Sequence, residues 1–236
     1  MSNFKKKTLL SSFMRPFETL GYKFLEDKST VAHGLFYKIL PNNLVLELGF
    51  TISNLKSKYT LSYYLSRGFQ FGLVFGDMPS ESYARIAKFL EYSERLEFLP
   101  KDYHGEKTKD GWWASLSLLE IEKVMEVVRI TESRFLRQEN LAENIMNSNH
   151  LKDRISFYED TFKHFLESSG ISKIDILESY KMSQVPSQWV SHMEREITQY
   201  LPYYKLSKQS VQAMSDSSWR YIWSIYLKLI DTDKSP

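Results

Sequence analysis

The feature that most constrains the fold is a set of consecutive runs in which apolar and polar residues alternate. Residues 44–53 carry a large apolar residue at every second position, and residues 59–66 and 69–76 repeat this pattern. Side chains of a strand point alternately to its two faces, so each run predicts a strand with one buried face. The connections are only a few residues long, whereas parallel neighbours need a long crossover. The runs therefore predict an antiparallel meander.

Shorter runs extend this sheet. Residues 22–24 and 35–39 predict two earlier strands, and the turn residues Pro41, Asn42 and Asn43 separate them from the central run. A sixth strand is expected over residues 112–118. The second face of the sheet carries small hydroxyl residues, glycines and Glu47, which suit a solvated face, a face covered by the C-terminal half, or a binding face.

Helical periodicity surrounds the sheet. Residues 3–20 repeat apolar positions at helical spacing and stop at Gly21. Similar spacing recurs over residues 79–90, over 120–147 as one long helix or two, and in stretches between 151 and 229. The predicted fold class is α+β, with an N-terminal helix, an antiparallel meander of five or six strands, and a helical C-terminal half.

No linker rich in proline, glycine or serine separates the sheet from the later helices, so one compact unit is favoured. If there is a boundary, Ser148 and Asn149 mark it. It would divide an α+β sheet domain at residues 1–147 from a helical subdomain at residues 148–236 that docks on it.

Composition bounds the location and the chemistry. The chain lacks cysteine, which excludes thiolate metal sites and cysteine nucleophiles and favours a reducing cytoplasm. No run approaches the roughly 18 apolar residues of a membrane span, and the N-terminus lacks the apolar core of a signal peptide. We expect a cytoplasmic protein without a membrane partner.

Charge is balanced overall but not along the chain. The net charge of +2 comes from 31 basic and 29 acidic residues, which argues against binding nucleic acid with the whole surface. Residues 1–76 are basic and residues 77–178 are acidic. This asymmetry indicates either two layers that complement each other or a polar binding surface.

The common catalytic spacings do not occur. The five histidines lack metal-binding pairs, and Gly68, Gly72 and Gly76 are not followed by the Lys-Ser or Lys-Thr of a phosphate loop. Glu47 is followed by Gly49, where a metal-dependent nuclease would place lysine. We therefore expect no catalytic residues, metal or cofactor. An enzyme whose site is assembled from residues distant in sequence stays an alternative.

Aromatic residues supply the candidate binding positions. Trp112 and Trp113 are adjacent, so in a strand one of them must face away from the core and can anchor a partner. Tyr203 and Tyr204 precede Lys205 and form a second aromatic and basic turn.

The alternative partner is a nucleic acid. Basic residues neutralise phosphates and aromatic rings stack on bases, and one cluster of the N-terminal sheet layer combines the two. Its members are Lys56, Lys58, Tyr64 and Arg67. No ribonucleoprotein motif accompanies them.

Several short segments carry a family resemblance. These are Leu20-Gly21-Tyr22, Phe36-Tyr37, Ser57-Lys58 and Tyr59-Thr60-Leu61. On these segments residues 3–76 resemble small bacterial α+β domains of uncharacterised function, some of which accompany toxin-immunity or antiphage genes. The resemblance implies an interaction protein and supplies no catalytic residues. Together with the missing catalytic motifs, it leads us to expect a non-enzymatic protein that binds another protein, as an immunity factor, inhibitor or adaptor does.

Overall fold

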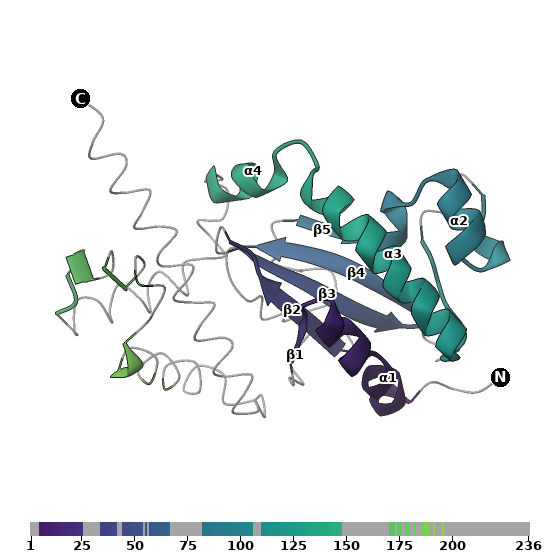
Figure 1. Cartoon of the computed structure of the whole chain (residues 1–236), viewed down its shortest axis with the longest axis horizontal. Helices are drawn as coiled ribbons and strands as arrows, with labels where there is room; N and C mark the ends of the chain where they lie inside the picture. Colours follow the sequence, from purple (N-terminus) through teal and green to yellow (C-terminus); the bar gives the residue numbers. More distant parts are fainter. Residues whose placement is uncertain are drawn as a thin grey trace.

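The computed structural model describes most of the first 147 residues and parts of the region that follows. The described residues are 5–25, 34–41, 44–53, 55, 57–66, 82–105, 110–147, 170–172, 174–175, 178–179, 182, 186–188, 191 and 195. Figure 1 shows their arrangement. In chain order the elements are α1 (Lys6–Thr19), β1 (Lys23–Leu25), β2 (Gly34–Ile39), β3 (Val45–Ile52), β4 (Tyr59–Ser66), β5 (Ser82–Arg85), the 3-10 helix η1 (Ile86–Phe89), α2 (Tyr92–Phe98), the 3-10 helix η2 (Lys101–Tyr103), α3 (Leu118–Leu136) and α4 (Leu141–Asn147).

The five strands form one antiparallel sheet in the order β1-β2-β3-β4-β5. Each strand therefore pairs with its neighbour in sequence, as short connections require. The antiparallel meander and the α+β class predicted from the sequence are confirmed, with an N-terminal helix before the sheet and helices after it.

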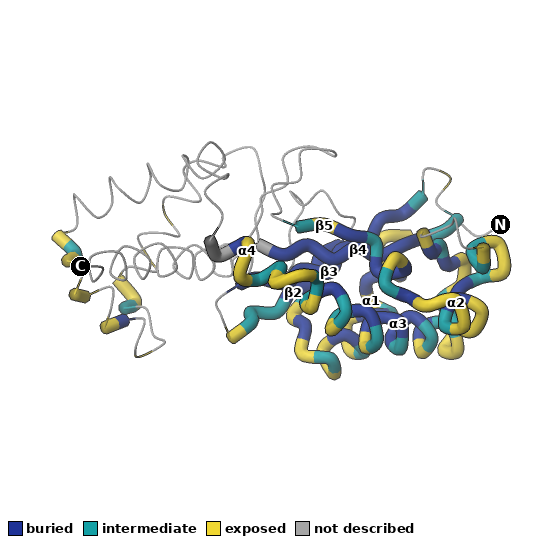
Figure 2. The backbone as a smooth tube through the Cα atoms, turned by 90° about the horizontal axis from the view of Figure 1, so that it is seen from above, coloured by how far each residue is buried: buried dark blue, intermediate teal, exposed yellow. Residues whose placement is uncertain are grey.

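One face of the sheet carries the main core. Helices α1 and α3 lie across this face (Figures 1 and 2), and their apolar side chains pack with Phe36 of β2 and with every second residue of β3 and β4. Phe13 and Phe17 of α1 contact Phe50 of β3, with ring centroids 5.0 and 5.9 Å apart. The large apolar residue at every second position of residues 44–53 thus matches the face of the sheet that the helices cover.

The first helix ends as its sequence predicts. Gly21 has a φ of +84°, and its N–H donates to the Glu18 carbonyl over 2.9 Å. A glycine adopts this left-handed conformation without the strain of a Cβ, so it stops the helix and turns the chain into β1.

The helix predicted over residues 79–90 is wrong for its described part. Residues 82–85 are strand β5 and residues 86–89 are η1. Ala84 enters the core while Tyr83 and Arg85 lie on the other face, which is a strand alternation. The tight turn that follows buries Ile86, Ala87 and Leu90. The spacing of these three residues is similar to that of the apolar face of a longer helix, which explains the wrong prediction.

The sixth strand predicted over residues 112–118 is reduced to a single antiparallel bridge between Tyr59 and Trp113. After Trp113 the chain leaves the sheet and reaches Ser117, whose side chain caps α3 by accepting from the Glu120 N–H.

Residues 120–147, predicted as one helix or two, form two: α3 and α4. The predicted strand at 69–76, the boundary at Ser148 and Asn149, and almost all of the stretch from 151 to 229 lie outside the described residues.

The second face of the sheet is also buried over its centre. Leu35, Tyr37, Val45 and Tyr64 form a small apolar cluster there, separate from the main core. Ser62, Thr60 and Glu47 on the same face are buried too. The second face is therefore buried and partly polar, although it does not belong to the main core.

Candidate partner-binding site

Side chains on this second face form a row that crosses all five strands. The strand register places each member beside the next, and the members are Lys23, Tyr37, Glu47, Tyr64 and Tyr83. Glu47 at the centre is only 2% exposed, whereas Tyr83 at the β5 edge is 48% exposed. The row therefore leads from a buried carboxylate between two tyrosines to an accessible tyrosine.

Four side chains at the exposed end of the row are connected, and we call them the edge cluster: Ser62, Tyr83, Arg85 and Trp112. Ser62 Oγ accepts a hydrogen bond from Arg85 Nη1 over 3.2 Å and lies 3.5 Å from Tyr83 Oη. The Arg85 guanidinium carbon lies 5.5 Å from the centre of the Trp112 ring, within the range of a cation–π contact. The Tyr83 ring packs on buried Tyr64 at 5.1 Å.

Two separate chain segments build this cluster because both use the outer edge of β4. Strand β5 pairs with residues 62–65, and Trp113 pairs with Tyr59 further along the same edge. The Tyr59 and Trp113 rings face the main core, so the neighbouring Trp112 side chain falls on the second face, beside Arg85. Arg85 and Trp112 are both half-buried.

The two tryptophans therefore have different environments. Trp113 is 0% exposed, stacks on Tyr59 and donates from Nε1 to the Phe98 carbonyl over 3.4 Å. It belongs to the core and is out of reach of a partner, so Trp112 is the member of the pair that stays a candidate.

Tyr64, the buried tyrosine on which the Tyr83 ring of the edge cluster packs, is kept neutral by its surroundings. Burial raises the pKa of Tyr64 well above the ordinary value, and the nearby Tyr83 and Glu47 add to this effect. The Ser62 hydroxyl and the Arg85 charge lower it by less. A neutral phenol at physiological pH packs and donates hydrogen bonds but is no proton acceptor for catalysis.

Sequence patterns located only part of this cluster. They identified Trp112 and the polar second face with Glu47, but they missed Ser62, Tyr83 and Arg85. The signal for the last two is the alternation of Tyr83, Ala84 and Arg85, which the helical interpretation of residues 79–90 obscured.

The candidate nucleic-acid residues are not assembled into one patch by the described structure. Tyr64 is buried at 4% exposure and packs on Tyr83. Lys58 lies 3.6 Å from an Asp102 carboxylate oxygen and over the Tyr103 ring. Six residues of strand separate Lys58 from Tyr64, which is about 20 Å. Lys56, Arg67, Tyr203 and Tyr204 lie outside the described residues.

A second polar cluster, also missed by sequence patterns, joins the helices to the sheet on the core side. Tyr22 Oη donates to Glu132 of α3 over 2.7 Å, and Lys38 Nζ of β2 pairs with the other oxygen of the same carboxylate over 2.5 Å. Lys38 also lies 4.3 Å from the centre of the Tyr22 ring. These groups satisfy one another, so the arrangement fixes α3 on the sheet.

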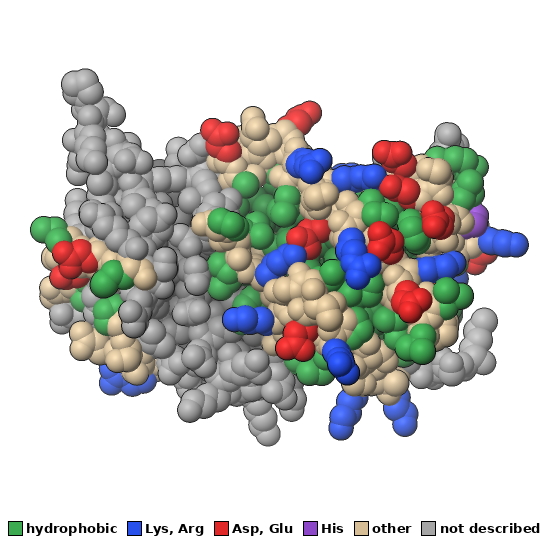
Figure 3. Space-filling view, in the orientation of Figure 1, with side chains coloured by type: hydrophobic (Ala, Val, Ile, Leu, Met, Phe, Trp, Pro, Cys, Tyr) green, Lys and Arg blue, Asp and Glu red, His purple; other side chains and the backbone are tan. Residues whose placement is uncertain are grey.

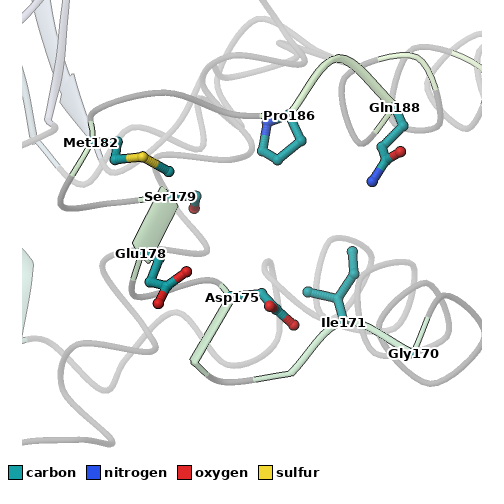
Figure 4. Close-up of a pocket in the computed structure, with 8 residues that line it drawn as sticks. All are labelled: Gly170, Ile171, Asp175, Glu178, Ser179, Met182, Pro186 and Gln188. Carbon is teal, nitrogen blue, oxygen red and sulfur yellow. The ribbon is translucent and has the colours of Figure 1, made fainter.

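A small cavity is present in the described part of the C-terminal region. Figure 4 shows Asp175 and Glu178 on one side and Pro186 and Gln188 on the other, around a volume of about 390 Å³. Asp175 accepts hydrogen bonds from the Ser172 N–H and hydroxyl, which lower its pKa. Its carboxylate is thus engaged in holding the local turn. Among the described residues, no three potential ligands are grouped for a metal ion.

Comparison with family models, curated proteins and solved structures found no match for this chain. The resemblance of residues 3–76 to bacterial α+β domains therefore stays a prediction. Within the described residues no helix has the length and apolar character needed to cross a membrane.

Proposed function

We propose that this protein is a non-enzymatic binding protein that recognises another protein through the edge cluster. The observation that carries the proposal is the grouping of Tyr83, Arg85 and Trp112 at an accessible edge of the sheet. Tryptophan, tyrosine and arginine are the residues that most often dominate the binding energy of protein interfaces. Ser62 and Tyr64 hold Arg85 and Tyr83 in place, and Arg85 in turn contacts Trp112, which lowers the entropic cost of binding.

The charge distribution supports a protein partner over a nucleic acid. On the helix-covered face, which Figure 3 shows, acidic and basic side chains are interspersed over α2 and α3, whereas phosphate binding would need a continuous basic region. The charge of Lys58 lies beside the Asp102 carboxylate at 3.6 Å, which reduces what it can offer to a phosphate. An immunity factor, inhibitor or adaptor acting in the cytoplasm fits this two-signed surface, in line with the predicted resemblance of residues 3–76.

The test is affinity purification of the tagged full-length protein from native cell extract, before and after nuclease treatment. We expect a stoichiometric protein partner that survives the nuclease. Trp112→Ala and Tyr83→Ala should each reduce its recovery, because each removes an interface ring, while the melting temperature stays nearly unchanged.

Tyr92→Ala is the matched control for Tyr83→Ala. Tyr92 is 57% exposed on α2, in the other layer of the fold, so its loss should leave recovery intact. The proposal is contradicted if Trp112→Ala and Tyr83→Ala recover the partner as well as the wild type does. Loss of every partner on nuclease treatment would support the nucleic-acid alternative instead.

A further inference from the structure

Arg85 is held in a way that prepares its guanidinium for an incoming anion. One donor, Nη1, bonds to Ser62 Oγ, and the charged group lies over the Trp112 ring. In the described part of the chain Arg85 has no carboxylate partner. Among the described strand residues, the acidic side chain of the second face is Glu47 on β3, two strands away from β5, which is about 10 Å across the sheet.

Other arginines of the described structure differ in partner or burial. Arg134 makes a two-pronged pair with Glu94, and Arg129 pairs with Glu126 over 2.8 Å. Arg15 and Arg137 are exposed on helix α1 and at the end of α3. Arg95 is buried and donates from Nε to the Leu90 carbonyl over 3.1 Å. Arg85 is only half-buried, is oriented by Ser62 and Trp112, and pairs with no carboxylate among the described residues.

The chemistry of the guanidinium defines the ligand. Arginine presents five N–H donors in a planar fork, and the bond to Ser62 uses one of them. The remaining fork matches the two oxygens of a carboxylate, and stacking on an aromatic ring fixes the plane of the fork. Trp112 and Tyr83 beside it offer apolar ring surface for the residue next to that carboxylate.

We propose that the edge cluster recognises an acidic segment of a protein partner, with an aspartate or glutamate carboxylate on Arg85 and a neighbouring apolar side chain against Trp112 and Tyr83. This inference rests on the proposed function, because it names the partner chemistry for the same surface.

The test uses random peptides displayed as a library and selected on the full-length protein. We expect the selected peptides to share an acidic residue beside an apolar one and to lose affinity with Trp112→Ala. Changing that acid to its amide, or changing Arg85→Gln, should each weaken binding about tenfold. The two changes together should cost no more than either alone, because both remove the same contact.

Two further variants define the contact. Arg85→Lys keeps the charge but not the fork, so it should also weaken binding. Arg129→Gln is the control on α3 and should bind as the wild type does, since Arg129 pairs with Glu126 in the other layer.

The outcomes separate the two proposals. Peptides that need Trp112 but tolerate the amide change overturn the acidic-segment inference and leave the binding function standing. Selection that yields no peptide dependent on Trp112 overturns both.

Discussion

At the scale of single residues, buried tyrosine hydroxyls link the two layers of the fold. Tyr63 Oη donates to the Val128 carbonyl of α3 over 3.1 Å and lies 3.0 Å from Thr131 Oγ1. Tyr59 Oη donates to the Ser115 carbonyl over 3.1 Å. Each ring fills the core while its own hydroxyl, which would otherwise be buried without a partner, makes a hydrogen bond.

We predict that Tyr63→Phe lowers the free energy of unfolding by about 1 kcal/mol, because the ring is kept and the hydrogen bond to α3 is lost. Urea denaturation followed by circular dichroism measures the change. Tyr92→Phe removes the hydroxyl of an exposed ring and should leave stability unaltered. Equal stability of Tyr63→Phe and the wild type would show that this hydroxyl contributes nothing.

At the scale of elements, α1 can approach β2 closely because residue 34 has no side chain. A Cβ built on Gly34 would overlap Leu10 Cδ2 of α1. On the other side of the fold, Glu94 of α2 both accepts from the Glu91 N–H over 2.8 Å and pairs with Arg134 of α3. Glu94 therefore belongs to the contact that docks α2 on α3.

We predict that Gly34→Ala destabilises the protein by about 1–3 kcal/mol, because the added methyl group displaces Leu10 from the core. In the double variant with Leu10→Ala the combined loss should be smaller than the sum of the two single losses. Chemical denaturation of the three variants measures this coupling.

Gly21→Ala is the matched control, since a Cβ there meets no atom within 4 Å and only the positive φ is strained. Its cost should be the same with and without Leu10→Ala. Strict additivity of Gly34→Ala and Leu10→Ala would contradict the steric explanation.

At the scale of the whole molecule, one sheet carries two different faces. The face under α1 and α3 is apolar and aromatic, whereas the second face places Glu47 and three tyrosines in register and also carries Ser62. Both faces bury phenols away from water. The protein as a whole therefore holds several tyrosines in their neutral form.

This arrangement predicts a loss of stability in alkali. Burial is the largest cause that raises the pKa of Tyr22, Tyr59, Tyr63 and Tyr64 above the ordinary value of about 10. Above that pH the unfolded chain releases tyrosine protons that the folded chain retains. The contribution of these groups is thus complete below about pH 10 and declines as the pH rises further.

Urea denaturation at neutral pH and at a series of values above about pH 10 measures this decline. A variant carrying both Tyr63→Phe and Tyr64→Phe should decline less steeply, because two of the retained protons are gone. A free energy of unfolding that stays constant into strong alkali would refute the prediction.

Local patterns in the sequence are enough to predict the central strands, their antiparallel pairing and the end of the first helix. Apolar and polar residues alternate strictly over residues 44–53 and 59–66, which predicts two strands. Because the connection between them is short, the two strands can pair only as an antiparallel hairpin. Gly21 ends α1 because a left-handed turn needs no Cβ. Trp112 and Trp113 are adjacent, and neighbouring side chains of an extended chain point to opposite faces, so their position in the sequence is enough to place them on different sides of the sheet.

Only the tertiary structure decided the edge of the sheet and the edge cluster. Four residues, 82–85, are too few for their period to separate strand from helix, and they become β5 because the outer edge of β4 offers backbone partners. Arg85 and Trp112 are far apart in sequence and meet because both segments line that same edge. The alternation of residues within a strand shows which face of the sheet each side chain lies on. Contacts between distant segments depend instead on which strand edges still have free backbone groups when the rest of the chain has folded.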